Sequence, residues 1–305
     1  MKTAIVSGAT GMVGSSTARY LSEQGVKVLC LGRQNLNPVD TENIFGHNAT
    51  YASVAMSDIE TLPRVLDALD WDTEHDCVFY HFAWSGLKNL TDGSLELQLS
   101  NAVNTSNAVK VAKHVGCKKF INVGTLEETF TETWISKKSN TPYISSQTNY
   151  IISKLASRDL GKITAYLEKI DYIHTRLSVP LDFELNKGNY IASTLKKIKN
   201  KESWEKPLSN NLYDITSLAD VSRVYFLIGL SRQTKADYYI GASEPATLSH
   251  IFDYFERSIR GFKIEAQLKL DENVKSIFST SKLKQDIGFS PSSNFRKIPT
   301  TLGIL

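Results

Sequence analysis

The chain has 305 residues, of which 41% are hydrophobic and 22% charged, and its formal net charge is +3. This composition is that of an ordinary globular protein with enough residues to bury a large core. The small net charge argues against nucleic acid or a membrane surface as partner, and no apolar run is long enough to span a bilayer. Three widely spaced cysteines argue against a disulfide framework, and no cationic and apolar leader precedes the first apolar run. We therefore expect a cytoplasmic protein.

A glycine-rich stretch at the start of the chain predicts a phosphate-binding turn. The apolar residues 4–6 predict a strand, and Gly8, Gly11 and Gly14 follow before a helical pattern that begins at Val13. Gly8 allows a sharp turn, Gly11 lets the backbone approach a pyrophosphate, and Gly14 allows the helix to pack closely on the sheet. The N-terminus of the helix then offers free N–H groups to the anion. The order of strand, glycine turn and helix is typical of a dinucleotide site.

Apolar runs and helical patterns alternate through the first half of the chain. We predict further strands at 26–31, 50–55, 77–82, 119–123 and 170–176, and helices at 59–69, 95–115 and about 143–169. Such alternation predicts an α/β fold with a Rossmann-like, doubly wound parallel sheet. A ligand should bind at the carboxyl ends of its strands.

After Pro180 the rhythm of the sequence changes. A lysine-rich stretch at 183–207 holds one helical segment, at 191–198, and the last sixty or so residues alternate short elements. Between them we predict a strand at 213–216, a helix at 218–230 and a strand at 238–241. This pattern predicts a smaller second domain built from two separated pieces. We expect the first domain to cover 1–178 and about 212–243, and the second about 179–211 and 244–305.

Two positions bear on the identity of the dinucleotide. The second strand ends in Gly32 and Arg33, without the carboxylate that favours NAD through the ribose hydroxyl. Arg33 can instead pair with the 2′-phosphate of NADP, so we predict NADP, with NAD as the alternative. Asp58 opens the helix after the third strand, where it can act as a cap and also contact the adenine.

Tyr150 and Lys154 are the predicted chemical centre. Four residues apart on a helix, they share one face. A lysine ammonium near a phenol lowers the pKa of the phenol, which can then exchange a proton with a carbonyl or alcohol oxygen. Thr125 follows the fifth strand and supplies a hydroxyl for the same oxygen.

With these residues the chain resembles an extended short-chain dehydrogenase/reductase of the kind that acts on nucleotide-activated sugars. The resemblance spans nearly the whole chain. Its motifs are Gly8-x-x-Gly11-x-x-Gly14, Asp58, His81-Phe-Ala-Trp84, Asn101, Thr125, Tyr150-x-x-x-Lys154, Arg176 leading to Pro180, Asp214, Asp220-Val221 and the phrase at 284–291.

The resemblance implies a role for each site residue. Thr125, Tyr150 and Lys154 would be the catalytic triad, and Lys154 would also hold the nicotinamide ribose. The expected cofactor contacts are Gly8, Thr10, Gly11, Met12, Val13, Gly14, Arg33, Asp58, Ile59, Phe82, Ala83, Trp84, Asn101, Val123, Tyr150, Lys154 and Pro180. The expected substrate contacts are Trp84, Glu127 and Asn189, and no metal site is expected. The first domain would then bind NAD(P) and the second the nucleotide sugar, in a homodimer formed through the two long helices.

The sequence also departs from the family. Tyr213 stands where an arginine often binds the diphosphate of the sugar nucleotide, so other cations are needed. The candidates are Lys187, Lys196, Lys197, Lys206, Arg260 and Arg296. Trp84 places a large aromatic ring at the start of a substrate loop, where it could stack on a sugar or nicotinamide face.

Three reactions fit this scaffold. A reductase uses NADPH to turn a 4-keto sugar into an alcohol, and the Arg33 interpretation favours it. A 4-epimerase and a 4,6-dehydratase both keep their cofactor, and Thr125-Leu-Glu127 is similar to the Thr-x-Glu of some dehydratases, although Leu126 replaces the acidic partner seen there. Glu127 or Glu128 could then act as acid or base. A non-catalytic NADP-binding scaffold is the remaining alternative, and bacterial envelope polysaccharide is the destination implied by resemblance.

Overall fold

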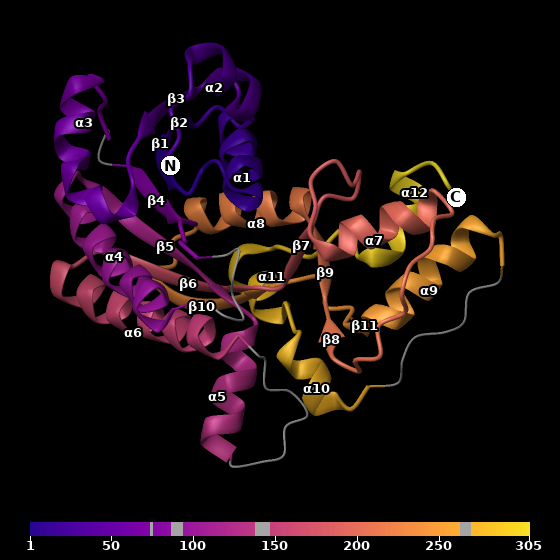
Figure 1. Cartoon of the computed structure of the whole chain (residues 1–305). Helices are drawn as coiled ribbons and strands as arrows, with labels where there is room; N and C mark the ends of the chain where they lie inside the picture. Colours follow the sequence, from indigo (N-terminus) through magenta and orange to yellow (C-terminus); the bar gives the residue numbers. More distant parts are fainter. Residues whose placement is uncertain (74–75, 87–93, 138–146, 263–269) are drawn as a thin grey trace. The chain divides into compact units, whose positions relative to one another are not determined.

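A computed structural model describes residues 1–73, 76–86, 94–137, 147–262 and 270–305. The chain divides into two compact units, one formed by Met1–Arg176 and Ser222–Tyr238 and the other by Leu177–Val221 and Tyr239–Leu305 (Figure 1). No helix in the described residues is both long and apolar enough to cross a membrane.

A seven-stranded sheet forms the centre of the first unit. Its strands are β1 (Thr3–Ser7), β2 (Lys27–Gly32), β3 (Ala49–Ser53), β4 (Cys77–His81), β5 (Cys117–Thr125), β6 (Asp171–Leu177) and β10 (Lys235–Ile240), in the order β10-β6-β5-β4-β1-β2-β3. β1 pairs in parallel with β2 and β4, β2 with β3, and β4 with β5. The strand order therefore reverses at β1, which is where doubly wound sheets bind ligands. The predicted fold class is confirmed.

Helices cover both faces of this sheet (Figure 1). They are α1 (Met12–Glu23), α2 (Pro38–Phe45), the 3-10 helix η1 (Met56–Thr61), α3 (Leu62–Ala68), α4 (Leu95–His114), α5 (Glu127–Lys137), α6 (Thr148–Glu168) and the part of α8 (Leu218–Leu230) after residue 221. α1 packs on α8, where the Tyr20 and Phe226 rings lie 5.8 Å apart. α4 lies along α6, and the hydroxyl oxygens of Ser106 and Thr164 are 2.7 Å apart. Buried side chains from strands and helices, among them Leu29, Phe79, Phe120, Ala108 and Ala112, form the core.

The second unit is built from short strands and helices. Its strands are β7 (Val179–Leu181), β8 (Leu212–Tyr213), β9 (Ile215–Ser217) and β11 (Ala246–Thr247), and its helices are α7 (Tyr190–Lys199), α9 (Leu248–Ile259), α10 (Glu272–Ile277), α11 (Ser281–Ile287), η3 (Phe295–Lys297) and α12 (Ile298–Thr301). β7 pairs in parallel with β9, and β8 pairs antiparallel with β11. Leu195, Phe252, Phe255 and Phe295 anchor its apolar core.

Two buried aspartates hold the loops of the second unit. Asp214 accepts hydrogen bonds from the N–H groups of residues 242–244 and from the Tyr239 hydroxyl. Asp220 accepts from the N–H and hydroxyl groups of Ser292 and Ser293. Each carboxylate satisfies backbone donors that would otherwise be buried without partners. The resemblance motifs at 214 and 220 thus have a structural explanation within this unit.

Several elements differ from the sequence-based predictions. The helix predicted at 59–69 is divided into η1 and α3, and the strand predicted at 213–216 is interrupted at Asp214, whose carboxylate binds a neighbouring loop. α2 and α5 were not predicted. α2 begins with Asn37, whose side chain accepts from the Asp40 N–H, and has Pro38 in its first turn. Residues 143–146 of the predicted long helix lie outside the described residues.

The unit boundaries can be compared with the expected domains. Residues 222–238 lie in the first unit, whereas 212–221 and 239–243 lie in the second. The physical reason is that β8 and β9 pair with β11 and β7, which belong to the second unit.

Candidate functional site

The glycine turn after β1 lines a cavity of about 220 Å³. The ends of β2 and β4 and the stretch after β3 contribute the other walls. The lining residues are Gly8, Thr10, Gly11, Gly32, Arg33, Val54, Met56, Phe82, Ala83, Trp84, Ser85 and Asn101. Eight of the predicted cofactor contacts therefore meet at this one cavity. Val54, Met56 and Ser85 were not singled out from the sequence, because only the sheet brings the residues after β3 next to the turn after β1.

The glycines of the turn are required by close backbone approaches. Gly8 has a φ of +69°, and a Cβ there would lie 2.6 Å from the Ala83 nitrogen. A Cβ on Gly14 would lie 2.3 Å from the Gly8 carbonyl oxygen, which no side chain can tolerate. The turn is thus held tightly between the first turn of α1 and the stretch that follows β4. Met12 and Val13 occupy that first turn of α1 but do not line the cavity.

The two residues expected to recognise the adenosine end differ in their surroundings. Arg33 is exposed at the cavity, and its guanidinium has no hydrogen-bond or ion-pair partner among the residues that the structure describes. Gly32 is explained by packing, because a Cβ there would lie 2.6 Å from the Tyr51 hydroxyl oxygen. Asp58 is exposed in η1, next to the buried Ile59, and neither of them lines the cavity.

A short loop after β4 closes one side of the cavity. Asn101 on α4 binds the Ser85 backbone in both directions, accepting from its N–H at 2.7 Å and donating to its carbonyl at 3.2 Å. Gln98, one turn earlier, accepts from the Trp84 indole N–H at 2.7 Å. Asn101 therefore acts on the cavity through the loop that it holds.

Trp84 links this cavity to the predicted catalytic residues. The Lys154 ammonium lies 3.7 Å from the centre of the Trp84 ring, and the Tyr150 ring meets the indole edge to face at 5.8 Å. A cation on an aromatic face is a favourable contact, particularly where water is excluded. The sequence suggested stacking on a ligand for Trp84, but it could not show that the indole lies on the catalytic lysine.

Thr125, Tyr150 and Lys154 come together at the carboxyl end of β5. Thr125 ends this strand, and its side chain hydrogen-bonds that of Tyr150 in the first turn of α6. Lys154 lies one turn further along α6 and donates to the Val123 carbonyl at 2.7 Å. A hydroxyl, a phenol and an ammonium thus share one corner of the sheet with Trp84.

Burial dominates the electrostatics of this group. Desolvation raises the pKa of Tyr150 well above its usual value, and the charge of Glu128 raises it further, while the hydrogen bond with Thr125 lowers it. Burial lowers the pKa of Lys154 to about 7, although the charge of Glu128 opposes this effect. The expected lowering of the phenol pKa by Lys154 is not found, because burial and the charge of Glu128 raise it.

The two acidic residues after Thr125 have different environments. Glu127 is partly exposed, and its N–H lies 3.4 Å from the Thr125 hydroxyl oxygen. Glu128 is fully buried. Its carboxylate accepts from the Thr125 N–H at 2.8 Å and contacts Nε2 of His174 at 2.8 Å. The suggestion that Glu128 is an acid or base at the mouth of the site is wrong, because its side chain is enclosed by protein atoms.

The remaining predicted contacts belong to the second unit. Pro180 lies in β7, and Asn189 caps α7 by accepting from the N–H groups of Ile191 and Ala192. This capping occupies the Asn189 side-chain oxygen, which leaves the side-chain NH2 group to donate a hydrogen bond to a ligand.

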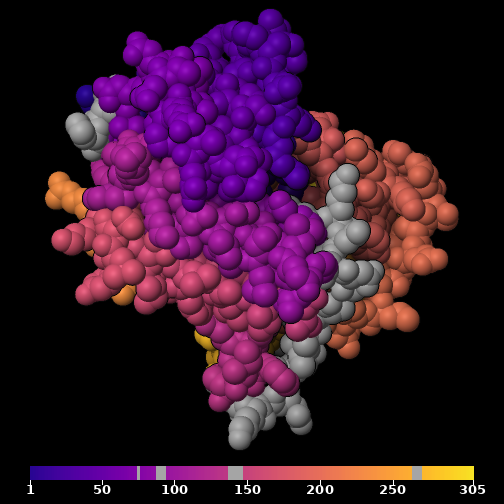
Figure 2. Space-filling view, turned by 60° about the vertical axis from the view of Figure 1, so that its left-hand side comes forward, coloured from indigo at the N-terminus to yellow at the C-terminus, as the bar shows by residue number. Residues whose placement is uncertain are grey.

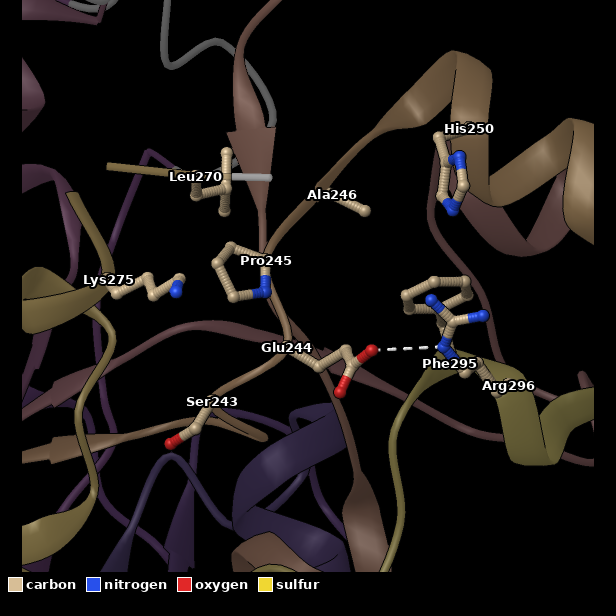
Figure 3. Close-up of a pocket in the computed structure, with 9 residues that line it drawn as sticks. All are labelled: Ser243, Glu244, Pro245, Ala246, His250, Leu270, Lys275, Phe295 and Arg296. Atoms are coloured by element: carbon tan, nitrogen blue, oxygen red, sulfur yellow. Dashed lines mark hydrogen bonds and ion pairs between the residues drawn. The ribbon is translucent and has the colours of Figure 1, made fainter. Parts of the chain in front are cut away.

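A separate cavity of about 90 Å³ lies within the second unit (Figure 3). His250, Phe295 and Arg296 line one side of it and Lys275 the other. Arg296 pairs with Glu244 at 3.0 Å, so its charge is already balanced. Two other candidate cations for a diphosphate also have carboxylate partners: Lys206 pairs with Asp253 and Arg260 with Glu256. In the described part of the chain, His, Cys, Asp and Glu residues form no group of three suited to a metal ion.

Comparisons with known proteins agree with this fold. A family model described as the NAD dependent epimerase/dehydratase family matches residues 4–241. None of the curated proteins matches the sequence.

Solved structures resemble the whole chain at low sequence identity. UDP-glucose 4-epimerase of Thermotoga maritima has a TM-score of 0.73 and 17% identity, covering 99% of this chain and 98% of that one. UDP-N-acetylglucosamine 4-epimerase of Bacillus cereus has a TM-score of 0.71 and 16% identity, with coverage of 100% and 95%. The dTDP-glucose 4,6-dehydratase of Bacillus anthracis, solved with NAD, has a TM-score of 0.72 and 15% identity, with coverage of 100% and 96%. The chain therefore belongs to the NAD-dependent epimerase/dehydratase family and is an enzyme of the extended short-chain dehydrogenase/reductase type.

Proposed function

We propose that the protein is an NADPH-dependent reductase of a 4-keto nucleotide sugar. The observation that carries the proposal is the convergence of Thr125, Tyr150 and Lys154 next to Trp84, which lines the cavity at the glycine turn. Gly8 and Gly11 line this cavity with bare backbone, as a pyrophosphate requires, and Arg33 lies at its edge. These features fit a dinucleotide whose reactive ring points toward Tyr150.

The proposed mechanism assigns one task to each side chain. A bound NADPH would supply the hydride for the ketone carbon. Tyr150 donates its phenolic proton to the oxygen as negative charge develops there, and the Thr125 hydroxyl donates a hydrogen bond to the same oxygen. Lys154 holds the nicotinamide ribose and keeps a positive charge near the phenol. Donors that are already in place for the growing charge give the largest rate effect.

Proton supply favours reduction over the alternatives. A reductase needs Tyr150 protonated at the start, whereas an epimerase or dehydratase begins by oxidising the sugar with the phenolate as base. Burial and the charge of Glu128 both raise the pKa of Tyr150, so they favour the protonated phenol. The alternative, a nucleotide-sugar 4-epimerase or 4,6-dehydratase, is favoured by the activities named for the similar solved structures.

A substrate panel separates these functions. Purified protein is incubated with NADPH and a set of 4-keto nucleotide sugars, and in parallel with UDP- and dTDP-hexoses. Stoichiometric oxidation of NADPH identifies a reductase. Conversion without net oxidation identifies an epimerase or dehydratase, as would NAD held tightly after purification. No conversion of any substrate would favour a non-catalytic NADP-binding scaffold.

We predict that Arg33 selects NADP over NAD. Replacing Arg33 by serine should weaken binding of 2′,5′-ADP by roughly tenfold or more, because a charge-assisted pair with the 2′-phosphate is lost. Binding of 5′-AMP should stay unchanged, since it lacks that phosphate. Isothermal titration of both ligands measures the effect. Equal affinities of the wild-type protein for the two ligands would contradict the proposed preference.

We also propose a homodimer formed through α4 and α6. Figure 2 shows part of the surface that these two helices form. Apolar side chains are exposed at helical spacing along both helices. They are Leu95, Leu99 and Val103 on α4, and Ile152, Leu160, Ile163 and Leu167 on α6. Apolar side chains exposed in this way are often covered by a partner, and a second copy is the occupant that the family resemblance implies. Light scattering of the purified protein tests this: a monomer mass would contradict it.

A further inference from the structure

A buried carboxylate, that of Glu128, contacts the backbone of the predicted catalytic residue Thr125. Glu128 in the first turn of α5 is fully buried, and its Oε1 accepts from the Thr125 N–H at 2.8 Å. Its Oε2 lies 2.8 Å from Nε2 of His174 and 3.7 Å from Nε of Arg176, both on β6. The glycine at 124 makes room for this carboxylate, because a Cβ there would lie 2.1 Å from Oε1.

Part of this arrangement is ordinary helix capping. The Glu128 carboxylate accepts from the Thr125 N–H three residues earlier, as the glutamate of a capping box does. The Thr125 hydroxyl accepts from the Glu127 N–H and not from that of Glu128. A capping glutamate, however, usually remains at the surface, where solvent reduces the effect of its charge. Glu128 instead has its second oxygen bound to His174 inside the protein. An ionised carboxylate only accepts hydrogen bonds, so Nε2 of His174 carries the proton of this contact.

The charge of Glu128 acts on groups from several elements. In the described residues these are Tyr150 and Lys154 on α6 and His174, Arg176 and Tyr172 on β6. Two further carboxylates of α5 bear on the same groups, since Glu127 also raises the pKa of Tyr150 and Glu132 pairs with Arg176. Arg176 is shared with Glu132, which also binds Arg158, so it offsets the charge of Glu128 only in part. Burial raises the pKa of Glu128, but His174, the Thr125 N–H and Arg176 together lower it below its usual value. The carboxylate is therefore ionised at neutral pH.

We propose that Glu128 is a positioning residue of this site: it fixes the Thr125 backbone and, as a buried negative charge, favours the protonated forms of Lys154 and Tyr150. The inference rests on the proposed roles of Tyr150 and Lys154. It explains how a lysine enclosed by protein can stay charged while it lies on the Trp84 ring. It also favours reduction, because Tyr150 can donate a proton to the substrate oxygen only if the phenol is protonated at the start of the reaction.

Titration of Lys154 tests the proposal without any substrate. The protein is labelled with ¹³C at the lysine Cε, and the Lys154 signal is identified by its absence in Lys154→Arg. The wild-type midpoint is expected near pH 7. Glu128→Gln retains an acceptor for the Thr125 N–H, and His174 can change tautomer to accept from the new amide. Without the charge, the Lys154 midpoint should fall by roughly one unit.

Glu132→Gln is the matched control. It removes a carboxylate one turn along the same helix that binds Arg176 but does not reach Thr125. Because it acts on Glu128 only by releasing Arg176, it should lower the Lys154 midpoint much less than Glu128→Gln does. An unchanged midpoint in folded Glu128→Gln would overturn the proposal, as would an equal fall in the control.

A second variant covers the case in which Glu128→Gln does not fold. Glu128→Met combined with His174→Leu replaces the buried pair by apolar side chains of similar size, a change that proteins often tolerate. The same fall in the Lys154 midpoint is expected there. If neither variant folds, the role is structural only and the proposal is wrong. A fall in the midpoint without turnover on the substrate panel would support Glu128 as a positioning residue while removing the reductase.

Discussion

Replacing Tyr150 by phenylalanine should lower kcat for reduction of the 4-keto sugar by roughly 10²–10⁴-fold, the range that general acid catalysis supplies. The phenol is the proposed proton donor, and phenylalanine has nothing to donate. NADPH affinity should remain nearly unchanged, because the ring still meets Trp84 edge to face and no other described contact depends on the hydroxyl except that of Thr125. The effect should therefore appear in kcat and not in coenzyme binding.

Stopped-flow measurement of NADPH oxidation gives kcat, and titration of NADPH fluorescence gives the affinity. Tyr166→Phe is the matched control, because Tyr166 lies on the same helix and its side chain is 81% exposed. Loss of its hydroxyl should change neither quantity. Turnover by Tyr150→Phe at a rate near that of the wild type would remove Tyr150 from the mechanism and with it the proposed reduction.

The parts of the site that depend on local sequence could be predicted. The glycine turn needs only the order of strand, turn and helix, and the structure explains Gly8 and Gly14 by contacts within the turn and with the stretch that follows β4. Tyr150 and Lys154 share a helix face by spacing alone. Their approach to Thr125 was expected from the family resemblance, and the position of a ligand from the carboxyl ends of parallel strands, which lie at one edge of the sheet.

The parts that depend on packing between distant segments could not be predicted. Glu128 was interpreted as a possible acid or base, because the local sequence does not show whether its carboxylate is enclosed by the protein. Only the pairing of β5 with β6 brings His174 against it, and only then is the carboxylate buried. The position of Trp84 on Lys154 likewise depends on Gln98, from a helix that the sequence does not connect with the lysine.

Replacing Lys154 by methionine should stabilise the protein at low pH. Only 7% of the Lys154 surface is exposed, and burial lowers the pKa of its ammonium from 10.5 to about 7. Below pH 7 the lysine is protonated in both the folded and the unfolded state, so the folded state bears the full cost of burying the charge. As pH rises from 7 to 10.5, the folded state releases its proton first and the cost disappears. The contribution of Lys154 to the free energy of unfolding of the wild type therefore increases with pH between 7 and 10.5.

The expected size follows from the same two pKa values. The full cost of the buried ammonium is on the order of 5 kcal/mol, since the pKa falls from 10.5 to about 7 and each unit corresponds to about 1.4 kcal/mol. Methionine removes this cost but leaves the Val123 carbonyl without its donor, a loss of roughly 1–2 kcal/mol. Lys154→Met should therefore be more stable than the wild type at pH 6 by about 3–4 kcal/mol. Between pH 6 and pH 9 this advantage should shrink by roughly 3 kcal/mol.

Urea unfolding of both proteins at pH 6 and pH 9 measures the change, and taking the difference removes every group that the two share. Lys162→Met is the control: this lysine is also on α6, but it is partly solvated and pairs with Asp237 at 2.9 Å. Its effect should not vary with pH in this range. A pH-independent effect of Lys154→Met would mean that the lysine is solvated in solution. A gain in stability that accompanies loss of turnover would instead show that the chain keeps a costly buried ammonium because the proton transfer at Tyr150 requires it.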